Sequence, residues 1–217
     1  MCWNQTISLN TFLFSFFGIN FAYLNRVITI YDYMYYIAFV SMQLLEYFAW
    51  GNLNNKKINR LLSQIGLLIV FLQPLLLIIS LTGVEYNIKA FVIALYTVFM
   101  LSCLLYFPID FSMVKAPNGH LGWNWLNYPL YIVLIYVFFY YILVLYSKQY
   151  VTFILYVILF IAIYYTYYKT TTWASLWCWI ANIITVKLII QTFFNPSLPN
   201  CLLFEKNWLF GPLTFFS

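Results

Sequence analysis

The chain has 217 residues, of which 65% are hydrophobic and 7% charged, and its mean hydropathy is +0.87. This balance excludes an ordinary soluble domain and indicates a multi-pass membrane protein. The formal net charge of +5 suits anionic lipid headgroups, and because no basic stripe lies outside the apolar stretches, nucleic-acid binding is excluded. The lipid bilayer is the expected partner, and association into a homo-oligomer is left open.

Seven apolar stretches each come close to the roughly 20 residues that a helix needs to cross about 30 Å of hydrocarbon. In chain order they are Ile7 to Leu24, Tyr31 to Trp50, Leu61 to Leu81, Ile88 to Phe107, Tyr128 to Tyr146, Tyr150 to Tyr168 and Thr172 to Phe194. Turn residues and charges mark the joints, which are too short to hold a soluble domain. The sequence therefore predicts an all-α polytopic membrane protein, with a seven-transmembrane-helix bundle over residues 1–194.

Residues 195–217 form an apolar tail that Pro196, Pro199 and Pro212 interrupt. We expect this tail to lie in the membrane interface or to pack on the bundle rather than to cross again. The densest basic cluster, Lys56 to Arg60, favours the cytoplasmic side for the second loop. The sequence thus predicts an integral membrane protein with a cytoplasmic N-terminus, in a membrane that it does not identify.

An odd number of spans puts the N-terminus and the second, fourth and sixth loops on one side of the membrane. That side collects seven of the eight Trp residues and the one His. Aromatic belts usually occupy both interfaces, so the asymmetry favours a site, with a one-sided Trp anchor as the alternative. The candidates for binding or permeation are Cys2, Asn4, Gln43, Glu46, Trp50, His120, Trp123, Ser175, Cys178 and Asn182.

Glu46 is the sharpest of these candidates. Gln43, Glu46 and Trp50 recur at helical spacing on one stripe of the second stretch. A carboxylate within a span costs roughly 2.5 to 3.5 kcal/mol to insert, so such residues usually face the bundle interior and serve a function. The alternative is that Glu46, close to the end of its span, reaches the interface.

Lys187, in the seventh stretch, is a second intramembrane charge, and Gln191 one turn away is a secondary candidate with it. Counting residues from the span ends separates Lys187 from Glu46 by about 14 Å in depth, so we expect no direct ion pair. A lysine in the last of seven helices also suggests a retinal Schiff base. Retinal is not expected, however, because Ile183 stands where an acidic residue commonly lies one turn earlier.

A narrow polar stripe follows one face of the seventh stretch: Thr171, Ser175, Cys178, Asn182 and Thr185. Small polar residues at such spacing permit close helix packing, and the alternative is that they line a polar path. In the third stretch, Pro74 predicts a kink and the release of one backbone carbonyl from the helix.

Cys2, Glu46, His120 and Cys178 share the Trp-rich side and together form a conceivable set of metal ligands. The set is unspecific, because the cysteines lack the Cys-x-x-Cys spacing of structural zinc sites. A lone histidine in a loop is also more often simply solvated.

Four short motifs fall on the side of the membrane predicted to hold the N-terminus: Met1-Cys2-Trp3-Asn4, the helix Gln43-Leu44-Leu45-Glu46-Tyr47-Phe48-Ala49-Trp50, the loop Gly119-His120-Leu121-Gly122-Trp123, and Trp177-Cys178. Together they resemble an uncharacterised family of short multi-pass membrane proteins from bacteria and large DNA viruses. Its members typically begin Met-Cys-Phe-Ser, from which Trp3-Asn4 departs, and carry a Gln-x-x-Glu-x-x-x-Trp helix. The resemblance implies a shared site and no particular activity.

The favoured function is a small channel or transporter with a Trp-rich polar vestibule on the N-terminal face. The alternative is an intramembrane enzyme acting on a lipid-like substrate. In that case Glu46 and His120 would be acid/base groups or metal ligands, and Cys2 a nucleophile or ligand. A structural or host-interaction role is the remaining possibility.

Overall fold

The computed structural model describes residues 4–148, 150–173 and 177–194. Within these ranges the chain is all-α apart from a short β-hairpin, which confirms the all-α part of the predicted fold class. The helices are α1 (Gln5–Leu24), α2 (Ile30–Gly51), α3 (Lys56–Ser80), α4 (Tyr86–Tyr106), α5 (Leu130–Tyr146), α6 (Tyr150–Tyr167) and α7 (Trp177–Phe193). The tail over residues 195–217, predicted to lie at the interface or on the bundle, falls outside the described residues.

A β-hairpin stands where the sequence predicts only a loop between the fourth and fifth apolar stretches. Strands β1 (Met113–Lys115) and β2 (Leu121–Trp123) pair antiparallel, and Gly119 takes the left-handed conformation (φ +80°) that the turn between them requires. The short turns η1 (Asn124–Leu126) and η2 (Tyr168–Thr170) follow β2 and α6. Strands of three residues are too short for alternating hydrophobicity to be read from the sequence.

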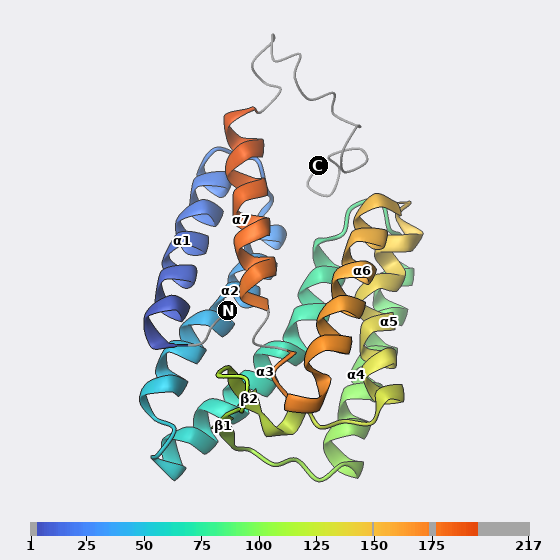
Figure 1. Ribbon diagram of the computed structural model, residues 1–217. Helices are drawn as coiled ribbons and strands as arrows, with labels where there is room; N and C mark the ends of the chain where they lie inside the picture. Colours follow the sequence, from blue (N-terminus) through green and yellow to red (C-terminus); the bar gives the residue numbers. More distant parts are fainter. Residues whose placement is uncertain (1–3, 149, 174–176, 195–217) are drawn as a thin grey trace.

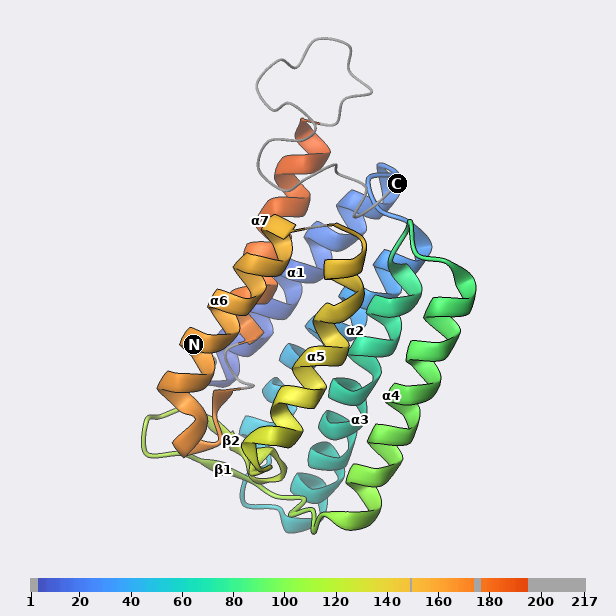
Figure 2. The ribbon, with the colours of Figure 1, turned by 90° about the vertical axis from the view of Figure 1, so that its right-hand side faces the viewer.

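Consecutive helices run in alternating directions, so their ends gather at two ends of the bundle (Figure 1). One end carries the start of α1, the loop from α2 to α3, the hairpin and the segment between α6 and α7; we call it the hairpin end. Packing is most extensive for the pairs α1 with α2, α2 with α3 and α1 with α7. Helices α4 and α5 stand against α3, and α6 packs beside α5 (Figure 2).

Three helices, α1, α3 and α4, are long and apolar enough to cross a membrane. Helix α4 buries only Tyr96 and Cys103, while Phe91, Val98 and Leu105 are each more than 60% exposed. An apolar surface of this extent is typical of a lipid-facing helix. Helices α5, α6 and α7 are also apolar but shorter, and α2 is more polar because it carries charged and amide side chains in the interior.

Every predicted span contains a helix, and most helix ends agree with the prediction to within two residues. Helix α3 is the clearest difference, since it begins at Lys56 rather than Leu61. The reason is a cap: the Asn55 side chain accepts a hydrogen bond from the Ile58 N–H at 3.3 Å. This cap adds a polar first turn to α3 that an apolar-run criterion leaves out.

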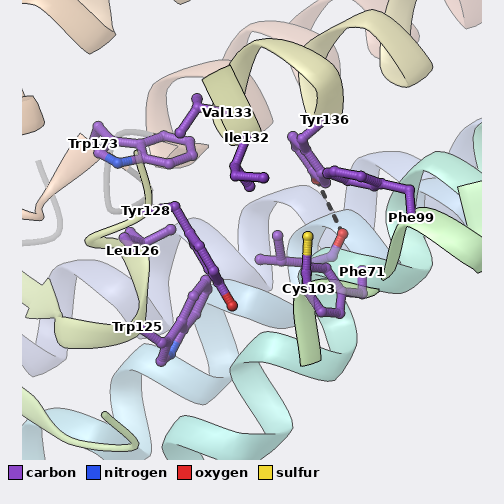
Figure 3. Close-up of a pocket in the computed structure, with 11 residues that line it drawn as sticks. Phe71, Phe99, Cys103, Trp125, Leu126, Tyr128, Ile132, Val133, Tyr136 and Trp173 are labelled. Atoms are coloured by element: carbon purple, nitrogen blue, oxygen red, sulfur yellow. Dashed lines mark hydrogen bonds between the residues drawn. The ribbon is translucent and has the colours of Figure 1, made fainter. Parts of the chain in front are cut away.

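Pro74 lies inside α3, where it cannot donate to the Val70 carbonyl. That carbonyl is the released one that the sequence predicts, and it accepts instead from the Tyr136 hydroxyl of α5 at 3.0 Å (Figure 3). The Tyr96 hydroxyl of α4 donates to the next carbonyl, that of Phe71, at 2.8 Å. Two buried tyrosines therefore tie α4 and α5 to α3 at its proline.

Replacing Tyr136 with Phe removes the donor to a buried carbonyl, so we expect the free energy of unfolding to fall by about 1–3 kcal/mol. In a Pro74→Ala background the new N–H of residue 74 can bond Val70, and the same substitution should then cost under about 1 kcal/mol. Equilibrium unfolding in detergent micelles of the native protein, the two single variants and the double variant measures the difference. Equal losses in both backgrounds would contradict this account of the bond.

Candidate functional site at the hairpin end

Gln43 and Glu46 lie one turn apart on the buried face of α2, and neither side chain is exposed. Helix α2 packs against α1 and α3, so the stripe that carries the two residues lies inside the protein. The expectation that Glu46 faces protein rather than lipid or the interface is confirmed. Trp50, at the end of the same stripe, is half-buried.

Contacts between neighbouring helices show which residues share the height of Glu46. The Gln5 side chain lies 3.1 Å from the position of a Cβ on Gly51, which sets the antiparallel register of α1 and α2. Near the other end of the pair, the Tyr33 hydroxyl donates to the Asn20 side chain at 3.3 Å. Gln5 therefore lies level with Gly51, and Asn20 with Tyr33. Between these two points, residue numbers rise along α1 as they fall along α2.

Two fully buried serines come to the height of Glu46 in this way. Ser8 of α1 lies within about two residues, or 3 Å, of Glu46 along the bundle. On the other side, Leu45 contacts Gly66 of α3, which brings Ser63 to the same height. The Ser8 hydroxyl bonds the carbonyl one turn earlier in its own helix, and among the described residues the Ser63 hydroxyl has no hydrogen-bond partner. Oxygen-bearing side chains from three helices thus form one buried layer.

Trp123 closes this layer from the hairpin end. Its side chain is fully buried, and its six-membered ring lies 2.5 Å from where a Cβ on Gly66 would stand. Only glycine at position 66 leaves room for the ring in this place. Trp125 packs edge-on against Trp123, with ring centroids 5.4 Å apart.

Side-chain amides hold the hairpin on the bundle. The Asn59 side chain of α3 donates to the Met113 carbonyl at 2.9 Å and accepts from the Met113 N–H at 2.8 Å. On the other side, the Asn118 side chain donates to the hydroxyls of Thr170 and Thr172 at 3.1 and 2.9 Å. The hairpin is therefore anchored both to α3 and to the segment between α6 and α7.

This anchoring corrects the predicted start of the seventh helix and of its polar stripe. Thr171 adopts a left-handed conformation (φ +53°), and its carbonyl accepts from the Trp123 N–H at 3.1 Å. Thr171 and Thr172 therefore belong to the connection, and Thr171 is not the first member of a stripe on α7. Within α7, Asn182 is half-buried, while Thr185 is buried and bonds its own helix at Ala181.

His120 is buried rather than solvated, so the interpretation as an ordinary loop histidine is wrong. Its backbone N–H donates to the Asn118 side chain at 3.2 Å, and its ring lies edge-on to Tyr167. Burial lowers the pKa of His120 below its usual value, which favours the neutral imidazole at pH 7. His120 lies in the hairpin, between β1 and β2, whereas Glu46 lies on α2, whose last turn leads to the same end of the bundle.

Three of the Trp residues at this end are inside the protein. Trp123, Trp125 and Trp173 are each at most 5% exposed, so they form the core of the hairpin end, whereas Trp179 on α7 is 45% exposed. A lipid anchor therefore does not account for those three. Trp125 and Trp173 also border a small apolar cavity of about 40 Å³ among α3, α4 and α5 (Figure 3). That cavity holds at most a few waters and lacks polar groups for a solute.

Other predicted site residues lie elsewhere. Asn4 is the exposed N-cap of α1, where its side chain accepts from the Ile7 N–H at 2.9 Å, which is a structural role. Cys2 and Ser175 lie outside the described residues, as does the side chain of Cys178. Lys187 is half-buried in the middle of α7, and Gln191 lies one turn beyond it.

The depth of Lys187 follows from its neighbours. Gly18 of α1 packs against Thr185 and the residue one turn after it on α7, so Lys187 lies at the height of Gly18. The α1–α2 register puts Gly18 level with residues 35–38, which leaves Glu46 about 12–16 Å away along the bundle. This agrees with the predicted difference in depth of about 14 Å.

Among the described residues, no three His, Cys, Asp or Glu side chains lie close enough together to hold a metal ion. Two of the four conceivable ligands, Cys2 and the Cys178 side chain, lie outside that part of the chain. The remaining two, Glu46 and His120, belong to different layers of the hairpin end.

Sequence reasoning did not single out Ser8, Asn59, Ser63 or Gly66. Their signal is helical spacing of small and polar residues: Asn59, Ser63 and Gly66 recur every three or four positions on α3. Ser8 begins a similar stripe on the buried face of α1. Such stripes are typical of close helix packing in membranes, and only the structure shows that Ser8 and Ser63 lie at the height of Glu46 while Asn59 and Gly66 hold the hairpin.

Comparisons with protein-family models, curated proteins and solved structures found no match. The resemblance to a family of short multi-pass membrane proteins therefore rests on the quoted motifs alone.

A methyl group on Gly66 would overlap the Trp123 ring, so Gly66→Ala should displace the hairpin and lower the free energy of unfolding by about 1–3 kcal/mol. Gly51→Ala is a matched control, because its methyl group meets only the flexible end of Gln5 and should cost under about 0.5 kcal/mol. Thermal unfolding in detergent compares the two. A loss at Gly66 that Trp123→Leu fails to relieve in the double variant would contradict this packing.

Proposed function

We propose that the chain is a seven-span integral membrane protein that conducts protons or small monovalent cations through the interior of α1, α2 and α3. In this proposal Glu46 is the group that binds the ion, and the Trp-rich hairpin end is the vestibule. The observation that carries the proposal is the complete burial of Glu46 in a layer of oxygen-bearing side chains from three helices.

Two observations support the seven-span arrangement. Six of the helices are apolar, and the polar face of the remaining one, α2, is buried against α1 and α3. The shorter helices α5, α6 and α7 have 17 or 18 residues, enough for about 26 Å of hydrocarbon. Each of them also exposes large apolar side chains, among them Leu134, Ile158 and Ile183. Helix α2 carries the polar residues on its buried face, against which α1 and α3 pack, and it exposes apolar side chains such as Met34 and Phe48 on the other.

The chemistry of the layer suits an ion. A carboxylate, an amide and hydroxyls supply the oxygen atoms that protons and hard cations bind. Keeping a carboxyl group away from water is costly, and intramembrane carboxyls usually mark ion pathways or proton relays. Trp123 stands between the layer and the hairpin end, so passage would require the hairpin to shift.

The test is ion flux into liposomes that contain the purified protein, driven by an imposed gradient of the ion concerned and followed with an enclosed dye sensitive to that ion: a pH dye for protons and sodium- or potassium-sensitive dyes for the two cations. We expect flux of protons, sodium or potassium above that of empty liposomes. Glu46→Gln should lower it by at least about tenfold, the effect of losing one charged ligand. Glu85→Gln removes the same charge from an exposed position and should leave the flux unchanged.

Thermal unfolding of both variants provides the folding control. The proposal fails if the native protein gives no flux of any of the three ions, or if folded Glu46→Gln conducts as well as the native protein.

A further inference from the structure

A groove of about 510 Å³ opens at the hairpin end, between the first turns of α3 and the segment that leads into β1. Its volume lies in the range of pockets that hold small ligands. Nothing in the Glu46 layer contributes to it, so it is separate from the proposed ion path.

Two cations line one wall of this groove. Lys56 and Arg60 are one turn apart on α3 and exposed, and among the described residues neither forms an ion pair. Asp110 also borders the groove, but its two oxygens already accept hydrogen bonds from the side chains of Ser112 and Asn124, at 2.8 and 3.0 Å. The carboxylate is thus bound to its own loop, whereas the cations have their donors available.

The rest of the lining is largely apolar: Leu53, Ile109, Phe111 and Met113. The groove also lies where α3, one of the helices able to cross a membrane, begins at Lys56. Cations beside apolar side chains at this depth match the chemistry of a lipid at the point where its phosphate joins its acyl chains.

We propose that this groove binds an anionic phospholipid, with Lys56 and Arg60 donating to the phosphate. The start of the acyl chains would lie along Phe111 and Ile109. Free phosphate shares the headgroup chemistry but leaves the apolar half of the groove unused, which is why lipid is the proposed occupant. The proposal depends on the chain lying in a membrane and is independent of ion conduction.

Binding should also stabilise the fold. Asn59 and Met113, whose two hydrogen bonds anchor the hairpin to α3, both border the groove. A lipid there would cover that anchor, and any ligand that binds only the folded state raises its stability.

The experiment titrates purified protein in detergent with short-chain phosphatidylglycerol, with phosphatidylcholine of the same chains, or with inorganic phosphate, and follows the midpoint of thermal unfolding. Phosphatidylglycerol should raise the midpoint and the other two should not. Lys56→Gln and Arg60→Gln should each weaken the apparent affinity about tenfold through the loss of a charged donor. Lys57→Gln removes the same charge from the next position, which does not line the groove, and should keep the native affinity.

Midpoints without lipid show whether each variant is folded. An equal response to phosphatidylcholine overturns the proposal, as does an equal loss in Lys57→Gln, which would indicate attraction by general surface charge. Stabilisation by inorganic phosphate to the same extent would replace the lipid with a soluble anion and overturn it as well.

Discussion

A helix that carries Asp32, Gln43 and Glu46 can lie in an apolar bundle only if other helices enclose it, and this constraint organises the structure. Helices α1 and α3 make their most extensive contacts with α2. Their buried faces are rich in small residues, which let backbones approach closely enough to exclude lipid. The helices on the outside are then free to be almost wholly apolar, as α4 is, because the polar groups have been gathered at the centre.

Irregular backbone in the bundle is accommodated because buried side chains supply the hydrogen bonds that it lacks. Pro74 opens the hydrogen-bonding ladder of α3 at a position buried in the protein, and the Tyr136 hydroxyl of α5 supplies the missing donor. At the hairpin end, Asn59 and Asn118 satisfy backbone and hydroxyl groups of segments that have no regular partner. In both places a side chain from a distant part of the sequence completes the hydrogen bonds and thereby fixes how two segments pack.

This dependence on distant partners marks the boundary of what the sequence could predict. The helices and the burial of Glu46 follow from local apolar runs and from helical spacing, so they could be predicted. The polar first turn of α3 could also be predicted, because its signal, the Asn55 cap, is local. The hairpin could not be foreseen, because its strands are short and its stability comes from Asn59, more than fifty residues away. The positions of Ser8 and Ser63 at the height of Glu46 could not be predicted either, because they depend on the register between neighbouring helices.

Two carboxyl groups are buried in α2, and comparing them shows why Glu46 rather than Asp32 is the functional candidate. Asp32 lies in the first turn, where its oxygen accepts from the Thr29 N–H and hydroxyl at 3.0 and 2.6 Å in a capping box. A carboxylate is favoured there by the helix dipole, so helix architecture accounts for Asp32. Glu46 lies more than one turn before the end of α2 at Gly51, so neither a cap nor the helix dipole favours a carboxylate there. Helix capping therefore does not account for the burial of Glu46, and buried intramembrane carboxyls outside caps usually serve a function.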